Sequence, residues 1–171
     1  MPRSPDELRE ASNHLFYEIE MLRSTAELLG TGAFGDSQLA NALIESFTIH
    51  ARALIDFLYG ERSRDDVLAE DFFPEGVWER PTPPANLDVD AIRRRVGKEI
   101  AHLTYDRQQV TLALKGWNYV EVGNAILRGL EEFAMRVSPD LLGERWPRTG
   151  GHPVDAARAI VVTQSNYTTN L

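Results

Sequence analysis

The chain contains no cysteine among its 171 residues. This absence excludes disulfide bonds and thiolate metal ligands, and it is typical of proteins in a reducing compartment. The sequence also lacks any run of about eighteen apolar residues that would span a membrane, and residues 1–10 contain no apolar core of a signal peptide. These absences predict a cytoplasmic protein that does not enter a membrane.

Basic residues are in the minority, with 18 Lys and Arg against 26 Asp and Glu and a net charge of −8. Such a chain is not suited to coating nucleic acid nonspecifically. Residues 93–107 are the exception, because five basic residues stand there against two acidic ones. This basic segment predicts either a local site for one phosphate-bearing ligand or an ordinary solvated helix face, and charge alone favours the solvated face.

The pattern of apolar residues predicts four amphipathic helices, over about residues 5–29, 36–59, 88–106 and 117–137. A long proline-rich connection, residues 60–87, separates the second helix from the third. This order predicts an all-α fold, a four-helix up-and-down bundle. We expect one domain over residues 1–146 and a loosely ordered tail over residues 147–171.

Local signals indicate where the helices begin and which side chains meet. Ser4 with Glu7 predicts a capping box at the start of the first helix, and Asp36 and Asp88 are the candidate caps of the second and third. Arg52 and Asp56 are four residues apart and predict an ion pair on the flank of the second helix. The large aromatic residues of the connection are expected to pack back on the bundle: Phe72, Phe73 and Trp78.

A second face of the third predicted helix carries Arg95, Lys98, His102 and Tyr105 at steps of three, four and three. Arg95 and His102 differ by about 20° in direction around the helix and by about 10 Å along its axis. Both side chains can therefore converge on one anion. Histidine suits proton transfer near neutral pH, and the arginine fork of donors matches two phosphate oxygens.

These residue types fit cleavage of RNA by its own 2′-hydroxyl. The reaction needs a proton acceptor, a proton donor and positive charge beside the phosphorane, and it needs neither a metal nor another cofactor. One helix supplies half of such a site, so a second copy of the chain or another helix must complete it.

The stretch "RVGKEIAHLTYDR", which begins at Arg95, resembles the signature of the HEPN superfamily of all-α domains. That signature is an arginine, four to six residues, and a histidine, which Arg95 and His102 match with six residues between them. The commoner spacing would place the arginine at Gly97, and Lys98 stands where an asparagine is frequent. The likeness extends over about residues 36–110.

The resemblance implies a HEPN-like ribonuclease of a toxin or defence type. Arg95 would hold the scissile phosphate, His102 would transfer protons, Lys98 and Tyr105 would assist, and His50 would support the site. Members of the superfamily often form homodimers with facing motifs, and toxins of this type have protein partners such as an antitoxin. Many other members are not enzymes. A dimeric binding or regulatory module that uses the same face for RNA, a nucleotide or a protein is therefore the alternative.

Two further histidines leave other possibilities open. His50 falls on the apolar stripe of the second helix, so it is either hydrogen-bonded within the fold or faces His102 across the bundle. His14 has Glu18 one turn later, which indicates a surface pair. A metal site built from these histidines is a minor alternative, because the Glu-x-x-His spacing of bundle metal sites occurs only once, at Glu99.

Overall fold

A computed structural model of the protein describes residues 3–63, 65–85, 87–95, 118–147 and 160, without the side chain of Arg95. Within these residues the chain is helical and contains no strand, which confirms the all-α fold class. The α-helices are α1 (Pro5–Gly30), α2 (Gln38–Tyr59), α3 (Val89–Arg95) and α5 (Tyr119–Arg136), and the 3-10 turns are η1 (Ala69–Phe72) and η4 (Pro139–Leu141). None of the described helices is long and apolar enough to cross a membrane.

Helix α1 begins and ends where its sequence predicts. The Ser4 hydroxyl accepts a hydrogen bond from the Glu7 amide at 3.3 Å, and the Glu7 carboxylate accepts one from the Ser4 amide at 2.8 Å. This capping box satisfies two amides of the first turn, and the bond from the Ser4 backbone is the main cause that lowers the pKa of Glu7. The helix ends at Gly30, and Gly32 then adopts a φ of 67°, a left-handed conformation that favours glycine.

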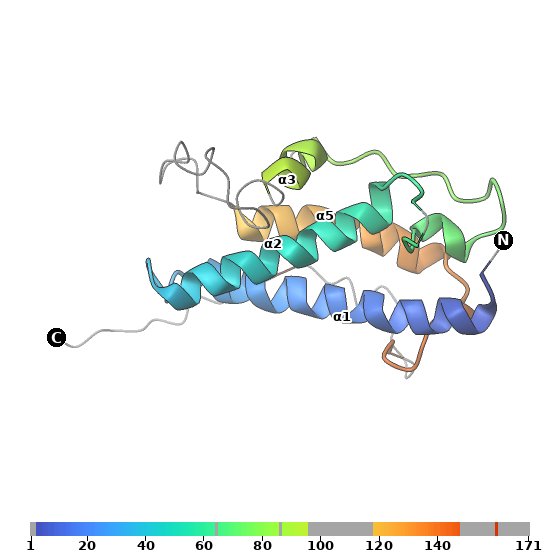
Figure 1. Ribbon diagram of the computed structural model, residues 1–171, viewed down its shortest axis with the longest axis horizontal. Coiled ribbons are helices and arrows are strands. Elements are labelled where there is room, and N and C mark those ends of the chain that lie inside the picture. Colours follow the sequence, from blue (N-terminus) through green and yellow to red (C-terminus); the bar gives the residue numbers. More distant parts are fainter. Residues whose placement is uncertain (1–2, 64, 86, 96–117, 148–159, 161–171) are drawn as a thin grey trace.

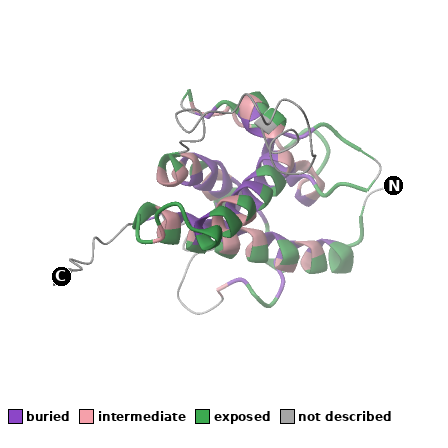
Figure 2. Cartoon of the chain, turned by 60° about the vertical axis from the view of Figure 1, so that its left-hand side comes forward, coloured by how far each residue is buried: buried purple, intermediate pink, exposed green. Residues whose placement is uncertain are grey.

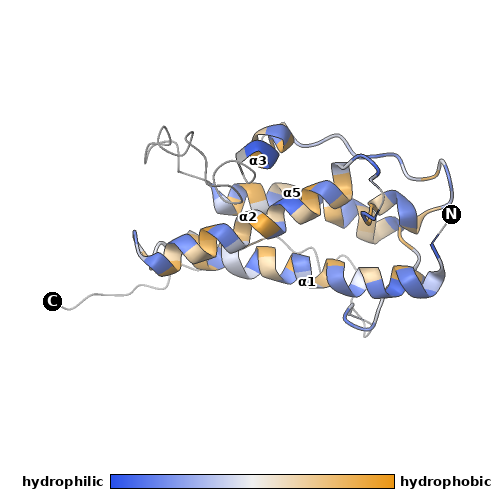
Figure 3. Ribbon diagram, in the orientation of Figure 1, coloured by the Kyte–Doolittle hydropathy of each residue, from blue (hydrophilic) through white to orange (hydrophobic). Residues whose placement is uncertain are grey.

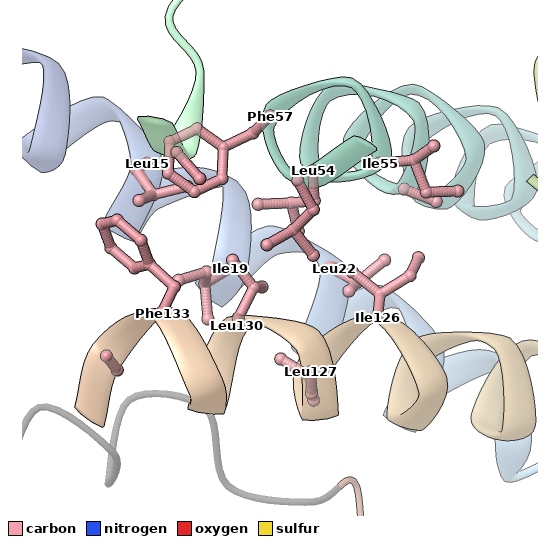
Figure 4. Packing of buried hydrophobic residues seen from close by; sticks show 14 of the residues in the cluster. Leu15, Ile19, Leu22, Leu54, Ile55, Phe57, Ile126, Leu127, Leu130 and Phe133 are labelled. Atoms are coloured by element: carbon pink, nitrogen blue, oxygen red, sulfur yellow. The ribbon is translucent and has the colours of Figure 1, made fainter. Parts of the chain in front are cut away.

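Helix α2 begins one residue later than its sequence suggests. Ser37, rather than Asp36, is the N-cap, because its hydroxyl accepts the Ala40 amide at 3.1 Å. The helix runs antiparallel to α1, and α5 packs against both of them (Figure 1). The shared core lies between these three helices, where Ile19 and Leu22 of α1 meet Leu54 of α2 and Leu130 of α5 (Figure 4).

The connection between α2 and α3 folds back onto this core, as its aromatic residues predict. Phe73 and Trp78 stack with ring centroids 4.8 Å apart, and both rings meet Phe133 of α5 nearly edge-on. Arg136 lies over the Trp78 ring at 4.9 Å and donates a hydrogen bond to the Val77 carbonyl at 2.8 Å. The proline-rich segment is therefore held by aromatic and cation–π contacts to α5.

Two segments after α5 return to the helices. Trp146 is buried against α1, where its indole N–H donates to the Ser12 carbonyl at 2.8 Å. Ile160 is buried against α5, and its amide donates to the Asn124 side chain at 2.7 Å. Of the predicted loose tail, residues 147–171, the structure describes Pro147 and this anchored isoleucine, and the other residues lie outside the described part.

Tyr59, at the end of α2, has a hydroxyl group that is buried without a hydrogen-bond partner among the described residues. The hydroxyl faces Gly129 of α5 so closely that a Cβ there would lie 2.8 Å from it. Burial raises the pKa of Tyr59, the charge of Glu132 raises it further, and Arg128 opposes them. The phenol therefore stays neutral well into the alkaline range.

We expect Tyr59→Phe to stabilise the protein by about 1 kcal/mol at neutral pH, because the change removes a polar group that burial desolvates without compensation. The folded protein holds the phenolic proton more tightly than the unfolded chain does. This tighter binding of the proton stabilises the folded protein by its full amount below about pH 10. The stabilisation is lost as the pH rises through the raised pKa of the folded state.

Urea unfolding of both proteins between neutral pH and about pH 11 measures this effect. The stability of the parent should fall more steeply above about pH 10 than that of Tyr59→Phe. Tyr17→Phe is the matched control, because Tyr17 is 42% exposed and its replacement removes no buried hydroxyl group. A Tyr59→Phe protein that is clearly less stable than the parent would show that the hydroxyl has a partner.

Candidate functional site

The basic segment starts on α3, which is fixed against the C-terminal half of α2. The Asp88 carboxylate accepts the Ala91 amide at 2.8 Å and so caps α3, as the sequence predicts. Arg93 then donates from its Nε to Oδ1 of Asp56 on α2 at 2.7 Å. The other oxygen of Asp56 accepts from Arg52 at 3.4 Å, which confirms the predicted pair on the flank of α2.

The predicted catalytic and assisting residues follow shortly after Arg93 in the sequence. Arg95 is the last described residue of α3, and its side chain lies outside the described part of the chain. Lys98, His102 and Tyr105 also lie outside the described residues. Arg94, which lies between Arg93 and Arg95, is exposed.

His50 is the predicted site residue that the structure describes in full. Its Nδ1 lies 2.6 Å from Oε2 of Glu18 on α1, and the two side chains are 11% and 27% exposed. The Tyr17 ring meets the imidazole edge-on at 5.7 Å. A carboxylate accepts hydrogen bonds, so Nδ1 carries the proton and, in the neutral ring, Nε2 is left as the acceptor. The described contacts of His50 therefore join α1 to α2.

The expected pair of His14 with Glu18 is wrong. Glu18 turns towards α2 and binds His50, whereas the exposed His14 lies 3.8 Å from Glu10, one turn earlier on α1. The physical reason is burial, because a carboxylate at the α1–α2 boundary gains more from a partly buried imidazole than from a solvated one. The sequence signal for the observed pair is weak: a histidine on the apolar stripe of one helix and a glutamate beside the apolar stripe of the neighbouring helix.

Two hollows lie elsewhere on the described surface. One has a volume of about 350 Å³ and is lined by Glu10, Asn13, His14, Tyr17 and Arg145. The other has a volume of about 440 Å³ and lies beside Arg62, which donates hydrogen bonds to both Glu70 and Asp71 at 2.7 Å. The bonds to Asp71 and then Glu70 raise the pKa of Arg62. The guanidinium of Arg62 therefore forms ion pairs within the fold.

Metal ligands do not gather in the described part of the chain, where no group of three or more His, Asp or Glu side chains converges. No protein-family model, curated protein or solved structure matches the chain. What the protein does is therefore inferred from its own residues, above all from the basic segment that α3 begins.

Proposed function

We propose that the chain is a HEPN-like four-helix, up-and-down bundle of the cytoplasm that cleaves RNA without a metal. In this proposal Arg95 binds the scissile phosphate and His102 transfers protons. The observation that carries it is the ion pair between Arg93 and Asp56, 2.7 Å long, which joins α3, whose last described residue is Arg95, to α2. A catalytic arginine needs such a support, because activity depends on positioning within a fraction of an ångström.

The ion pair also divides the roles among the clustered arginines. Arg93 is 29% exposed and neutralised by Asp56, so it serves the fold. The cationic charge for a ligand is then assigned to Arg94, Arg95 and Lys98. Three cations on one short segment suit a polyanion, and an arginine fork suits the two free oxygens of a phosphodiester.

The proposed reaction balances without a cofactor. A base, His102, takes the proton of the 2′-hydroxyl while its oxygen forms a bond to phosphorus. The bond from phosphorus to the 5′-oxygen breaks, and that oxygen takes a proton from an acid. Arg95 and Lys98 offset the charge of the phosphorane, and Tyr105 donates a hydrogen bond to it. The products are a 2′,3′-cyclic phosphate and a 5′-hydroxyl.

A second copy of the chain is assigned the second proton-transfer group, because one base cannot also be the acid in the same step. His50 has a different role in this proposal. Its hydrogen bond to Glu18 holds α1 to α2. We assign it no contact with the substrate. His50 is therefore a positioning residue for the bundle.

The test is cleavage of a mixed RNA panel by the full chain in EDTA. We expect products that end in 2′,3′-cyclic phosphate, and we expect Arg95→Ala and His102→Ala each to lower the rate by at least about 100-fold. His14→Ala and Arg145→Ala are the matched controls, because both side chains are exposed on the described surface away from α3. Their rates should equal that of the parent.

Two outcomes would contradict the ribonuclease proposal. Cleavage that EDTA abolishes would indicate a metal-dependent activity. A folded parent that cleaves nothing in the panel would favour the alternative, a non-catalytic module. In that case loss of RNA binding in Arg95→Ala but not in Arg145→Ala would assign the same basic segment to binding.

A further inference from the structure

Two consecutive residues of α5, Gly123 and Asn124, are unfavourable inside a helix. Glycine and asparagine both have a lower helix propensity than alanine, and neither residue is at an end of α5, which runs from Tyr119 to Arg136. Gly123 is buried and Asn124 is half-buried, so both lie where α5 contacts the rest of the protein. Their presence is therefore explained by what they contact rather than by the helix itself.

The close neighbour of Gly123 is the side chain of Ile160. A Cβ atom on Gly123 would lie only 2.5 Å from Cδ1 of Ile160. Ala26 of α1 and Phe47 of α2 would tolerate that atom, because they would lie 3.6 and 3.8 Å from it. Figure 2 shows buried residues on the sides of the helices that face one another, and Figure 3 shows hydrophobic residues there. Among the described neighbours, it is therefore Ile160, and not the packing of the helices, that requires the glycine.

The side chain of Asn124 binds the main chain of the same isoleucine. Its Oδ1 accepts a hydrogen bond from the Ile160 amide at 2.7 Å, and its Nδ2 donates to the Ile160 carbonyl at 3.4 Å. Ile160 is not helical, and in an extended chain the amide and the carbonyl of one residue point to the same side. Main-chain hydrogen bonds combined with a pocket for a side chain are a common way to bind an extended peptide.

We propose that the hole at Gly123 and the amide of Asn124 form a binding site for an extended peptide that carries an isoleucine or a valine. In the free protein the internal ligand of this site is the chain's own Ile160 segment, residues 155–165. An extended segment of a partner protein with the same chemistry replaces it. Asn124 binds the main chain of either ligand, and the hole at Gly123 selects a branched aliphatic side chain.

The described contacts hold the internal ligand weakly enough for exchange. They consist of one buried side chain, 4% exposed, and the hydrogen bonds to Asn124, whereas ordering the backbone of the segment costs free energy of similar size. A segment on the same chain acts at an effective concentration of about 1 mM. If it occupies the site about nine-tenths of the time, the separate peptide binds the vacant site with a Kd of about 100 µM.

Fluorescence anisotropy of a labelled peptide tests the site. The peptide has the sequence of residues 155–165, "DAARAIVVTQS", and is titrated with the full chain up to about 500 µM. Ile160→Ser vacates the site in the protein, so this variant should bind the peptide at least about tenfold more tightly than the parent does. A control peptide with serine in place of the isoleucine should bind the variant at least about tenfold more weakly, because it buries no aliphatic side chain.

Two further changes in the Ile160→Ser protein test the two parts of the site. Asn124→Ala should weaken peptide binding about three- to tenfold through the lost hydrogen bonds, and Gly123→Ala about tenfold, because its methyl group takes the space of the isoleucine. Both changes introduce a better helix former, so the melting temperature should be kept or raised. Weaker binding without a loss of stability distinguishes a binding site from general damage to the fold. Met135→Ala is the matched control on α5, where Met135 is 57% exposed, and should leave peptide binding unchanged.

Four results would overturn the proposal. A folded Ile160→Ser protein that binds no peptide would show that there is no site, and equal binding of the peptide and its serine form would show that the hole does not select the side chain. A parent that binds the peptide as tightly as the variant does would exclude the internal ligand. An Ile160→Ser protein that does not fold, as measured by circular dichroism, would assign Ile160 to the core, because a segment that cannot leave is not an exchangeable ligand. The site shares no residue with the basic segment and is measured without RNA, so this proposal and the ribonuclease proposal fail separately.

Discussion

Replacement of Phe133 by alanine should destabilise the protein by about 3–5 kcal/mol, the usual cost of removing a fully buried aromatic ring. Phe133 has no exposed surface and stands at the centre of an aromatic cluster. Its ring centroid lies 5.0 Å from that of Phe57 and 5.3 Å from that of Phe72. Phe73 and Trp78 meet it at 5.9 and 6.0 Å. Alanine would leave a cavity that joins α2, η1 and the proline-rich connection.

Thermal and urea unfolding measure the loss. The melting temperature should fall by roughly 10 °C for a chain of this length. Met135→Ala, two residues further along α5, is the matched control and should change the stability by less than about 0.5 kcal/mol. A Phe133→Ala protein within about 1 kcal/mol of the parent would mean that the connection does not pack on α5 as described.

Trp146→Ala should have an effect of similar size, about 3–5 kcal/mol, for a different reason. The indole is 3% exposed, meets the Phe16 ring at 5.5 Å, and donates its N–H to the Ser12 carbonyl. It closes a buried polar cluster, in which the Ser12 hydroxyl accepts the Gly143 amide at 2.6 Å and donates to the Arg9 carbonyl at 2.8 Å. Loss of the indole would expose these bonds to water.

The matched variant is Trp146→Phe, which keeps a buried ring but lacks the N–H. We expect it to retain most of the packing and to lose about 1–2 kcal/mol, mainly through the lost hydrogen bond. Urea unfolding followed by circular dichroism compares the two variants with the parent. Equal losses in both variants would assign the stabilisation to the hydrogen bond rather than to the ring.

Local signals in the sequence predict the ends and caps of helices well. The capping box at Ser4, the cap at Asp88 and the pair of Arg52 with Asp56 all involve residues three or four apart. Such contacts depend only on the geometry of one helix, which the sequence sets directly. The aromatic residues of the connection are predicted for a related reason, because large apolar side chains must be buried somewhere.

Contacts between helices were not predictable in the same way. Glu18 with His50 and Arg93 with Asp56 join different helices, and their residues are 32 and 37 positions apart. Each pair depends on how far one helix is rotated and shifted against its neighbour. The spacing of residues along one helix does not predict this rotation or shift. The same limit applies to Ile160. Its side chain packs against Gly123 and its amide donates to Asn124, and no local pattern in the sequence predicts these contacts.

The bonds between α1 and the segment after α5 also set the order in which the chain can assemble during translation. Gly143 and Ser12 are separated by 131 residues, whereas α1 and α2 are neighbours in the sequence. At about 5–20 residues per second, a ribosome makes Gly143 roughly ten seconds after Ser12. A nascent chain can therefore form the α1–α2 hairpin early, but the side of α1 that carries Ser12 stays exposed until Gly143 has been made, and a chaperone can bind it during this time.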